Sequence, residues 1–160
     1  MLSRTHLKVL NGNACKRLME RENNIDILLF GADKNPDSYG ILALAYMGDA
    51  VMELFARDLV LHKSGEVKPG GLVRASKAYI TCEAQSDAAE RILPKLSESE
   101  AAVFKRGRNA KTHFSPNHGD IIQYRRATGL EALFGYLYVS GDIQRAKQLF
   151  LAAFLNENNT

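Results

Sequence analysis

Two carboxylates stand within apolar stretches of this 160-residue chain. Asp49 is surrounded by the small and apolar residues of positions 44–51, and Glu131 by those of positions 129–135. A carboxylate in apolar surroundings is unfavourable unless it is paired or binds a cation. Two such acids, each on its own helix beside small residues that permit close approach, form a minimal platform for a hard divalent cation such as Mg²⁺. We therefore predict that both are buried and share one site.

Simpler interpretations of the same acids remain open. Asp49, Glu53 and Arg57 are spaced four residues apart, which is also the pattern of a solvent-exposed charge ladder along one helix. Glu131 taken alone is equally explained as a buried acid with a paired side chain.

A basic stretch lies between Lys105 and Arg126, with six basic residues against the single acid Asp120. Cationic side chains mixed with short polar ones suit the phosphates and sugar hydroxyls of a nucleic acid. The residues expected to contact RNA are Arg106, Arg108, Asn109, Lys111, Thr112 and Arg125. The alternative is an ordinary solvated loop. His113 and His118 lack a third ligand at zinc spacing, so we do not expect a zinc site here.

The elements that must position these residues are predicted to be helices, because strand-like alternation is nearly absent. A short amphipathic piece at 13–30 and a turn-rich break at 31–37 come first. Long helices are expected at 39–62, capped by Asp37 or Ser38, and at 72–93, stopped by Pro94. Ser97 and Glu100 form a capping box that opens a helix to about 107. Further helices are expected at 120–139 and 143–155. The fold class predicted is all-α.

Composition excludes several classes of protein. The hydrophobic fraction of 46% and the charged fraction of 24% are those of a globular chain, not of a disordered or fibrous one. Two cysteines exclude a disulfide scaffold and a Cys-rich zinc site. No apolar run reaches the ~18 residues of a membrane span, and no signal peptide is visible. We expect a cytoplasmic protein.

Two motifs and the basic stretch carry a family resemblance. The motifs are Leu44-Ala45-Tyr46-Met47-Gly48-Asp49-Ala50-Val51 and Gly129-Leu130-Glu131-Ala132-Leu133-Phe134-Gly135-Tyr136-Leu137. Together they resemble the ribonuclease III catalytic domain, and with Lys105-Arg106-Gly107-Arg108-Asn109-Ala110-Lys111 they look closest to its Mini-III branch, which lacks a double-stranded-RNA-binding domain. The resemblance covers about residues 35–155. It implies a catalytic domain at 35–156, preceded by an N-terminal extension and short helix at 1–34, with 1–18 outside the resemblance and Met19 as an alternative start.

The resemblance also implies roles for single residues. Asp49 and Glu131 match the catalytic metal-ligand aspartate and glutamate, and Tyr46 matches the aromatic residue that contacts the partner subunit of a homodimer. The sequence departs from the larger enzymes of the family at Leu42, Ala45 and Thr128, where those enzymes carry further acids.

Glu53 and Asp120 are candidate supporting acids that would compensate for the missing carboxylates. If helix 120–139 is straight, however, Asp120 lies roughly 16 Å from Glu131, too far to share its metal. On that geometry Asp120 is instead an N-cap or a residue on the RNA side.

The activity implied by the resemblance is Mg²⁺-dependent hydrolysis of double-stranded RNA, with Mn²⁺ as a substitute, leaving 5′-phosphate and 3′-hydroxyl ends. Mini-III further implies maturation of the 23S ribosomal RNA precursor, in a ribosomal assembly intermediate. One alternative is a non-catalytic double-stranded-RNA-binding module of ribonuclease III fold. Another is a helical scaffold that binds no RNA.

Overall fold

The computed structural model describes residues 35–64, 68–111 and 120–155, and every regular element within these ranges is a helix or a 3-10 turn. The elements are η2 (Pro36–Ser38), α2 (Ile41–Ser64), α3 (Pro69–Ile80), α4 (Cys82–Ile92), η3 (Leu93–Lys95), α5 (Glu98–Arg108), α6 (Ile121–Val139) and α7 (Ile143–Phe154). The all-α prediction is confirmed. All of these elements fall in the compact unit of residues 33–160. The extension and short helix predicted at 1–34 lie outside the described residues and stay predictions.

Helix boundaries are set by caps, and two predictions about them are wrong. The helix predicted at 72–93 is two helices, because Thr81 is extended (φ −72°, ψ 152°) and its hydroxyl accepts a hydrogen bond from the Ala84 N–H at the start of α4. Asp37 and Ser38 do not cap α2, since they belong to η2. The capping box of Ser97 and Glu100 is confirmed at the start of α5.

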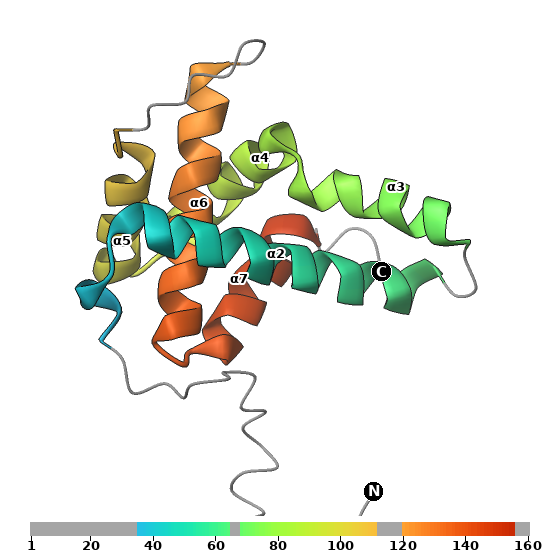
Figure 1. The fold of residues 1–160 in the computed structure, drawn as a ribbon, viewed down its shortest axis with the longest axis horizontal. Coiled ribbons are helices and arrows are strands. Elements are labelled where there is room, and N and C mark those ends of the chain that lie inside the picture. Colours follow the sequence, from blue (N-terminus) through green and yellow to red (C-terminus); the bar gives the residue numbers. More distant parts are fainter. Residues whose placement is uncertain (1–34, 65–67, 112–119, 156–160) are drawn as a thin grey trace, which may run out of the picture. The chain divides into compact units, whose positions relative to one another are not determined.

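α6 is the central helix, and it packs against α2, α4, α5 and α7. Figure 1 shows α2 crossing α6, with α5 and α4 on opposite sides of α6. A helix enclosed in this way must be apolar around most of its circumference. α6 fits that requirement in its middle, where every residue of 127–130 and of 132–135 is buried.

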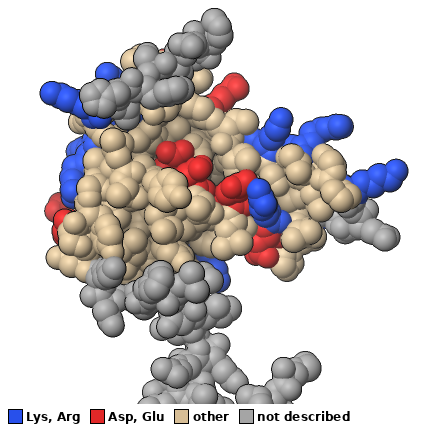
Figure 2. Space-filling view, viewed as in Figure 1, with Lys and Arg blue, Asp and Glu red and all other residues tan. Residues whose placement is uncertain are grey.

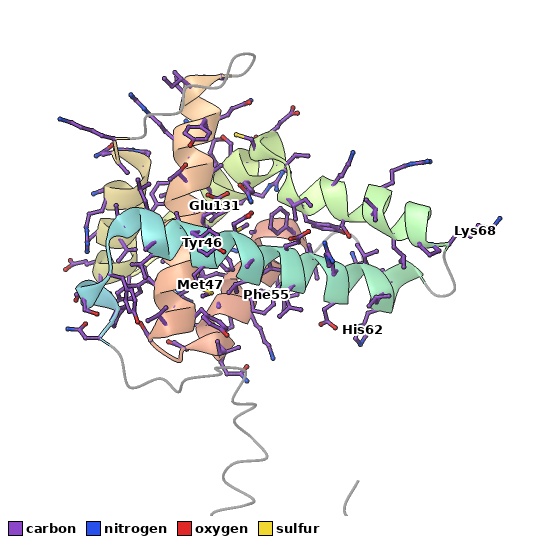
Figure 3. All side chains as sticks on the ribbon, in the orientation of Figure 1. Tyr46, Met47, Phe55, His62, Lys68 and Glu131 are labelled. Atoms are coloured by element: carbon purple, nitrogen blue, oxygen red, sulfur yellow. The ribbon has the colours of Figure 1, made fainter. Side chains whose placement is uncertain are left out.

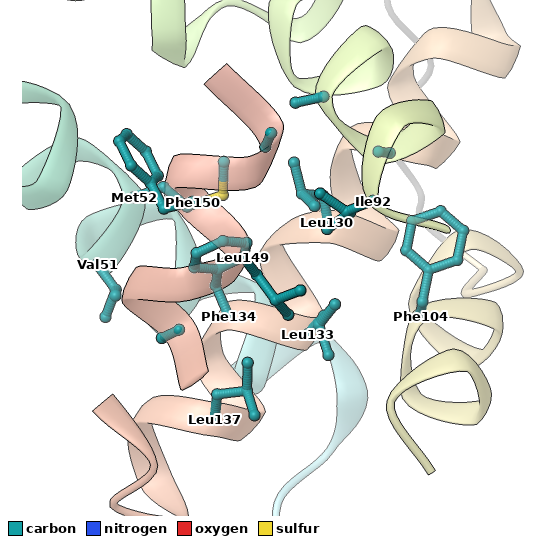
Figure 4. Close-up of a cluster of buried hydrophobic side chains, with 14 of the residues drawn as sticks. Val51, Met52, Ile92, Phe104, Leu130, Leu133, Phe134, Leu137, Leu149 and Phe150 are labelled. Carbon is teal, nitrogen blue, oxygen red and sulfur yellow. The ribbon is translucent and has the colours of Figure 1, made fainter. Parts of the chain in front are cut away.

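The hydrophobic core lies where these helices meet (Figure 4). Phe134 of α6 packs edge-on against Phe55 of α2 and Phe150 of α7. On α2, Leu44 and Val51 are buried, whereas Leu54 is 51% exposed. The inward face is centred on Met52, and Leu54 lies two residues, about 200°, further round the helix. Within the described ranges no helix is both long and apolar enough to cross a membrane.

Candidate active site

The two candidate acids are brought together by a backbone-to-backbone crossing of α2 and α6. A Cβ atom added to Gly48 would lie 1.7 Å from the backbone oxygen of Glu131, and one added to Gly135 would lie 1.9 Å from the backbone oxygen of Leu44. Only glycine fits at either position, because there is no flexible side chain to move aside. Asp49 follows Gly48 on α2, so the crossing itself sets the distance between the two acidic residues.

The carboxylates of this pair differ in exposure. Glu131 lies on α6 next to α2 (Figure 3) and is largely buried, whereas Asp49 is exposed. The expectation that both acids are buried is therefore wrong for Asp49. Its neighbour Gly48 occupies the contact with α6, and one residue further along the helix turns the side chain about 100° away toward solvent.

The pKa values of both carboxyls are raised above their ordinary values. Burial, and to a lesser extent the nearby negative charge of Asp49, together raise the pKa of Glu131 to about 7, while the Gln85 amide acts in the opposite direction. The pKa of Asp49 is also raised, by partial burial and by the charge of Glu53. Crowded carboxylates that resist ionisation gain most from a cation placed between them.

The chemistry of the donors decides which cation fits. Among the described residues no group of three or more His, Cys, Asp or Glu side chains could hold a metal ion. The donors at the crossing are therefore two carboxylates, which suits a hard cation such as Mg²⁺ that keeps several water ligands. Ala45 and Thr128, two positions where the family resemblance places further acids, supply no carboxylate here. Both are buried, and the Thr128 hydroxyl donates to the Tyr124 carbonyl.

Of the two candidate supporting acids, Glu53 lies close to Asp49, but the three acids Asp49, Glu53 and Glu131 do not form a metal-binding group. Glu53 lies one turn beyond Asp49, influences its pKa, and accepts a hydrogen bond from Arg57 at 2.5 Å. Asp120 instead caps the start of α6, where its Oδ1 accepts a hydrogen bond from the Ile122 N–H at 2.8 Å. Both interpretations of the acids on α2 therefore hold in part. Glu53 and Arg57 form an exposed ion pair along the helix, and Asp49 lies at the crossing with α6.

A third polar residue at the site escaped the sequence analysis. Gln85 of α4 is 2% exposed, and its amide lies close enough to Glu131 to lower the pKa of that carboxyl. Its Nε2 has no hydrogen-bond partner among the described residues. The sequence does contain a signal for its burial. Gln85 is spaced three, four and seven residues before Ala88, Ala89 and Ile92, which places it on the same buried face of α4.

The basic residues lie at the end of α5 and the start of α6. Arg108, Lys111 and Arg125 are exposed, and the Arg108 Nε donates to the Asn109 side chain at 3.2 Å. Arg106 is also exposed and lies 3.5 Å from the Asp37 carboxylate. Arg126 forms an ion pair with Glu90, so it is not part of the unbalanced charge. Thr112 lies outside the described residues. Figure 2 shows the molecule from the same side as Figure 1. On this side acidic side chains lie near the middle, and most Lys and Arg side chains lie toward the margins.

The comparison with protein-family models decides the family. The model described as the ribonuclease III domain matches residues 42–142, a span that contains both Asp49 and Glu131. The chain belongs to the ribonuclease III family.

Relatives within the ribonuclease III family match most of the helical unit. The chain is 40% identical to the Mini-ribonuclease 3 of Symbiobacterium thermophilum, over 74% of this chain and 91% of that one. It is 41% identical to the Mini-ribonuclease 3 of Brevibacillus brevis, over 76% and 90%. A crystal structure of a protein from Fusobacterium nucleatum superposes with a TM-score of 0.65 at 30% identity, covering 74% of this chain and 93% of that one. The resemblance to Mini-III is thereby confirmed.

An exposed apolar surface lies on α2 of this ribonuclease III domain. Tyr46 is 82% exposed, and Leu42, Leu54 and Leu61 are also exposed. At about 100° per residue, these four side chains fall within roughly 120° of one another around the helix. Glu53 falls within the same sector of the helix, and Asp49 lies about 20° outside its edge.

Proposed function

We propose that the crossing of α2 and α6 is the catalytic centre of a Mg²⁺-dependent endoribonuclease, with Asp49 and Glu131 as metal ligands. As a member of the ribonuclease III family, the chain is an endoribonuclease acting on double-stranded RNA. The observation that supports this location is the meeting of two carboxylates at a glycine crossing, where burial first and the charge of Asp49 second raise the pKa of Glu131 to about 7.

The residues of the crossing suit that chemistry. A bound Mg²⁺ would supply an activated water and stabilise charge on the reacting phosphate. Asp49 contributes an exposed carboxylate that the substrate side can reach, and Glu131 contributes a less exposed one. Glu131 must release its proton before it can act as a ligand, so metal binding and protonation compete at this side chain.

The duplex is held, in this proposal, by the basic surface of α5 and α6. Arg106, Arg108, Lys111 and Arg125 would contact phosphates, and Asn109 and Thr112 the sugar hydroxyls. Such contacts recognise the shape and 2′-hydroxyls of an RNA duplex rather than its base sequence.

We further propose a homodimer that matures the 23S ribosomal RNA precursor. The exposed stripe of Leu42, Tyr46, Leu54 and Leu61 supports a self-complementary interface about a two-fold axis. The relatives named Mini-ribonuclease 3 support the precursor as the substrate, since the Mini-III resemblance implies that role.

The test is cleavage of a labelled RNA duplex by the full chain with Mg²⁺ and with chelator, beside a single strand of the same sequence. We expect cleavage of the duplex only, dependent on Mg²⁺ and restored in part by Mn²⁺, leaving 5′-phosphate ends. Duplex binding without cleavage in either metal would instead support a non-catalytic RNA-binding module, which the absence of acids at Leu42, Ala45 and Thr128 allows.

A further inference from the structure

Gln85 is a buried polar side chain whose amide nitrogen is unpaired among the described residues. Its side chain is 2% exposed on α4, and Nε2 reaches no hydrogen-bond acceptor among the described residues. Buried amide donors are nearly always paired, because an unpaired one has lost its hydration without compensation. An apolar side chain would fill the same space beside Ala88 and Ala89 without that cost.

The surroundings of Gln85 indicate what the free donor is for. The amide lies beside the Glu131 carboxyl, and Glu131 in turn faces Asp49 across the crossing. A carboxylate that binds a metal through one oxygen presents its other oxygen to a neighbouring donor. Donors of this kind fix the orientation of metal ligands, and their loss typically costs 10–100-fold in metal affinity or activity.

We propose that Gln85 is a positioning residue for Glu131, and that its Nε2 donates to the Glu131 carboxylate in the metal-bound enzyme. The proposal rests on the proposed function, since it takes Glu131 as a metal ligand. Gln85 touches neither substrate nor metal in this assignment. It restricts the rotation of the one ligand that is buried, while the exposed Asp49 has no such support among the described residues.

The first experiment uses the full-length protein with Gln85→Met, which keeps the length and volume of the side chain and removes the amide. We expect the Mg²⁺ concentration for half-maximal cleavage to rise roughly 10–100-fold. The rise in melting temperature on adding Mg²⁺ should shrink. The melting temperature without metal should stay at or above that of the wild type, and the affinity for duplex RNA without metal should be unchanged. Gln144→Met, the same replacement at an exposed position of α7, is the matched control.

An unchanged Mg²⁺ requirement in folded Gln85→Met would overturn the proposal, and so would a lowered metal-free melting temperature with an unchanged Mg²⁺ requirement. A second measurement needs no variant. In nuclear magnetic resonance spectra of the wild type, the Gln85 side-chain amide protons should shift and exchange more slowly with solvent when Mg²⁺ is added. An amide that does not respond to Mg²⁺ contradicts the proposal even if Gln85→Met fails to fold.

Asp49→Asn and Glu131→Gln in the same Mg²⁺ titration separate this inference from the proposed function. If these two variants lose Mg²⁺ binding and Gln85→Met matches the wild type, only the role of Gln85 is wrong. If the two variants bind Mg²⁺ and cleave normally, the metal site itself is misassigned and Gln85 has no ligand to position.

Discussion

Glu131 is packed against α2 and is also a proposed metal ligand. Burial against α2 and the charge of Asp49 both disfavour its ionised form, which is the form that a metal requires. With a pKa of about 7, Glu131 is only about half ionised near neutral pH until a cation offsets the two negative charges. This makes the stability of the protein depend on pH and on Mg²⁺ together.

The metal-free protein should lose stability as the pH rises from about 4.5 to about 7. In the folded protein Glu131 keeps its proton up to about pH 7, whereas the unfolded chain releases it near the ordinary value of 4.5. The folded state therefore binds more protons in this window, and raising the pH favours unfolding by up to about 3 kcal/mol. Urea denaturation in chelator, at several pH values, measures this change.

Glu131→Gln is the variant that tests the origin of the pH dependence. It cannot ionise, so it should lack the loss of stability between pH 4.5 and 7, whereas Asp58→Asn, an exposed acid on α2, should retain it. Added Mg²⁺ should stabilise the wild type more at pH 7.5 than at pH 5.5. Parallel stability curves for the wild type and Glu131→Gln would show that Glu131 ionises normally.

Among elements, the α2–α6 crossing carries the greatest constraint. Gly135→Ala should destabilise the protein by roughly 3 kcal/mol or more, at or above the top of the usual range for overpacking, because the new Cβ would collide with the Leu44 carbonyl. Gly70→Ala in α3 is the control, since a Cβ there meets nothing within 4 Å. Chemical denaturation compares the two. Equal stability of both variants would mean that the helices do not cross as closely as described.

The ends of α5 and α6 should govern RNA affinity separately from bond cleavage. Replacing Arg106, Arg108 and Lys111 by Ala should weaken duplex binding about equally across sequences and lower the salt slope of log K by roughly 1 for each lost phosphate contact. The rate of single-turnover cleavage at saturation should change far less, because none of the three replaced residues is one of the proposed metal ligands, which are Asp49 on α2 and Glu131 in the middle of α6.

A second triple variant controls for the loss of charge alone. Lys68 at the N-cap of α3 and Arg74 and Lys77 within α3 are exposed, and replacing all three by Ala removes the same number of charges from another element. The slope of log K against salt should then stay close to that of the wild type. Equal effects of the two triple variants would indicate a general electrostatic attraction rather than a binding surface at α5 and α6.

Most of the helices and the two acids could be predicted from sequence, and the exceptions have physical causes. Asp49 and Glu131 stood out because their neighbours are apolar, and Ser97 with Glu100 because a capping box is a local signal. The break at Thr81 was missed since a single extended residue leaves the apolar period on both sides intact. Gln85 was missed because its burial depends on α6, nearly fifty residues away, and the exposure of Asp49 depends on which face of α2 the glycine crossing occupies.

At the scale of the whole molecule, the exposed stripe on α2 predicts a dimer. Tyr46 at 82% exposure, with Leu42, Leu54 and Leu61, is more apolar surface than a single helix usually presents to water. Light scattering at micromolar concentration should give twice the mass of the 17.7 kDa chain, and Tyr46→Glu should give the mass of one. A wild type that is monomeric under these conditions would contradict the dimer.

The central claim is that Asp49 and Glu131 hold the metal that cleaves RNA. Single-turnover cleavage of a saturating RNA duplex by Asp49→Asn and Glu131→Gln, with duplex affinity measured in parallel, tests this claim most directly. Both substitutions keep the side-chain volume and remove the charge, so we expect cleavage to be abolished while folding and duplex affinity stay near the wild type. Asp58→Asn should cleave normally. Near wild-type cleavage by either Asp49→Asn or Glu131→Gln would contradict the assignment of the site.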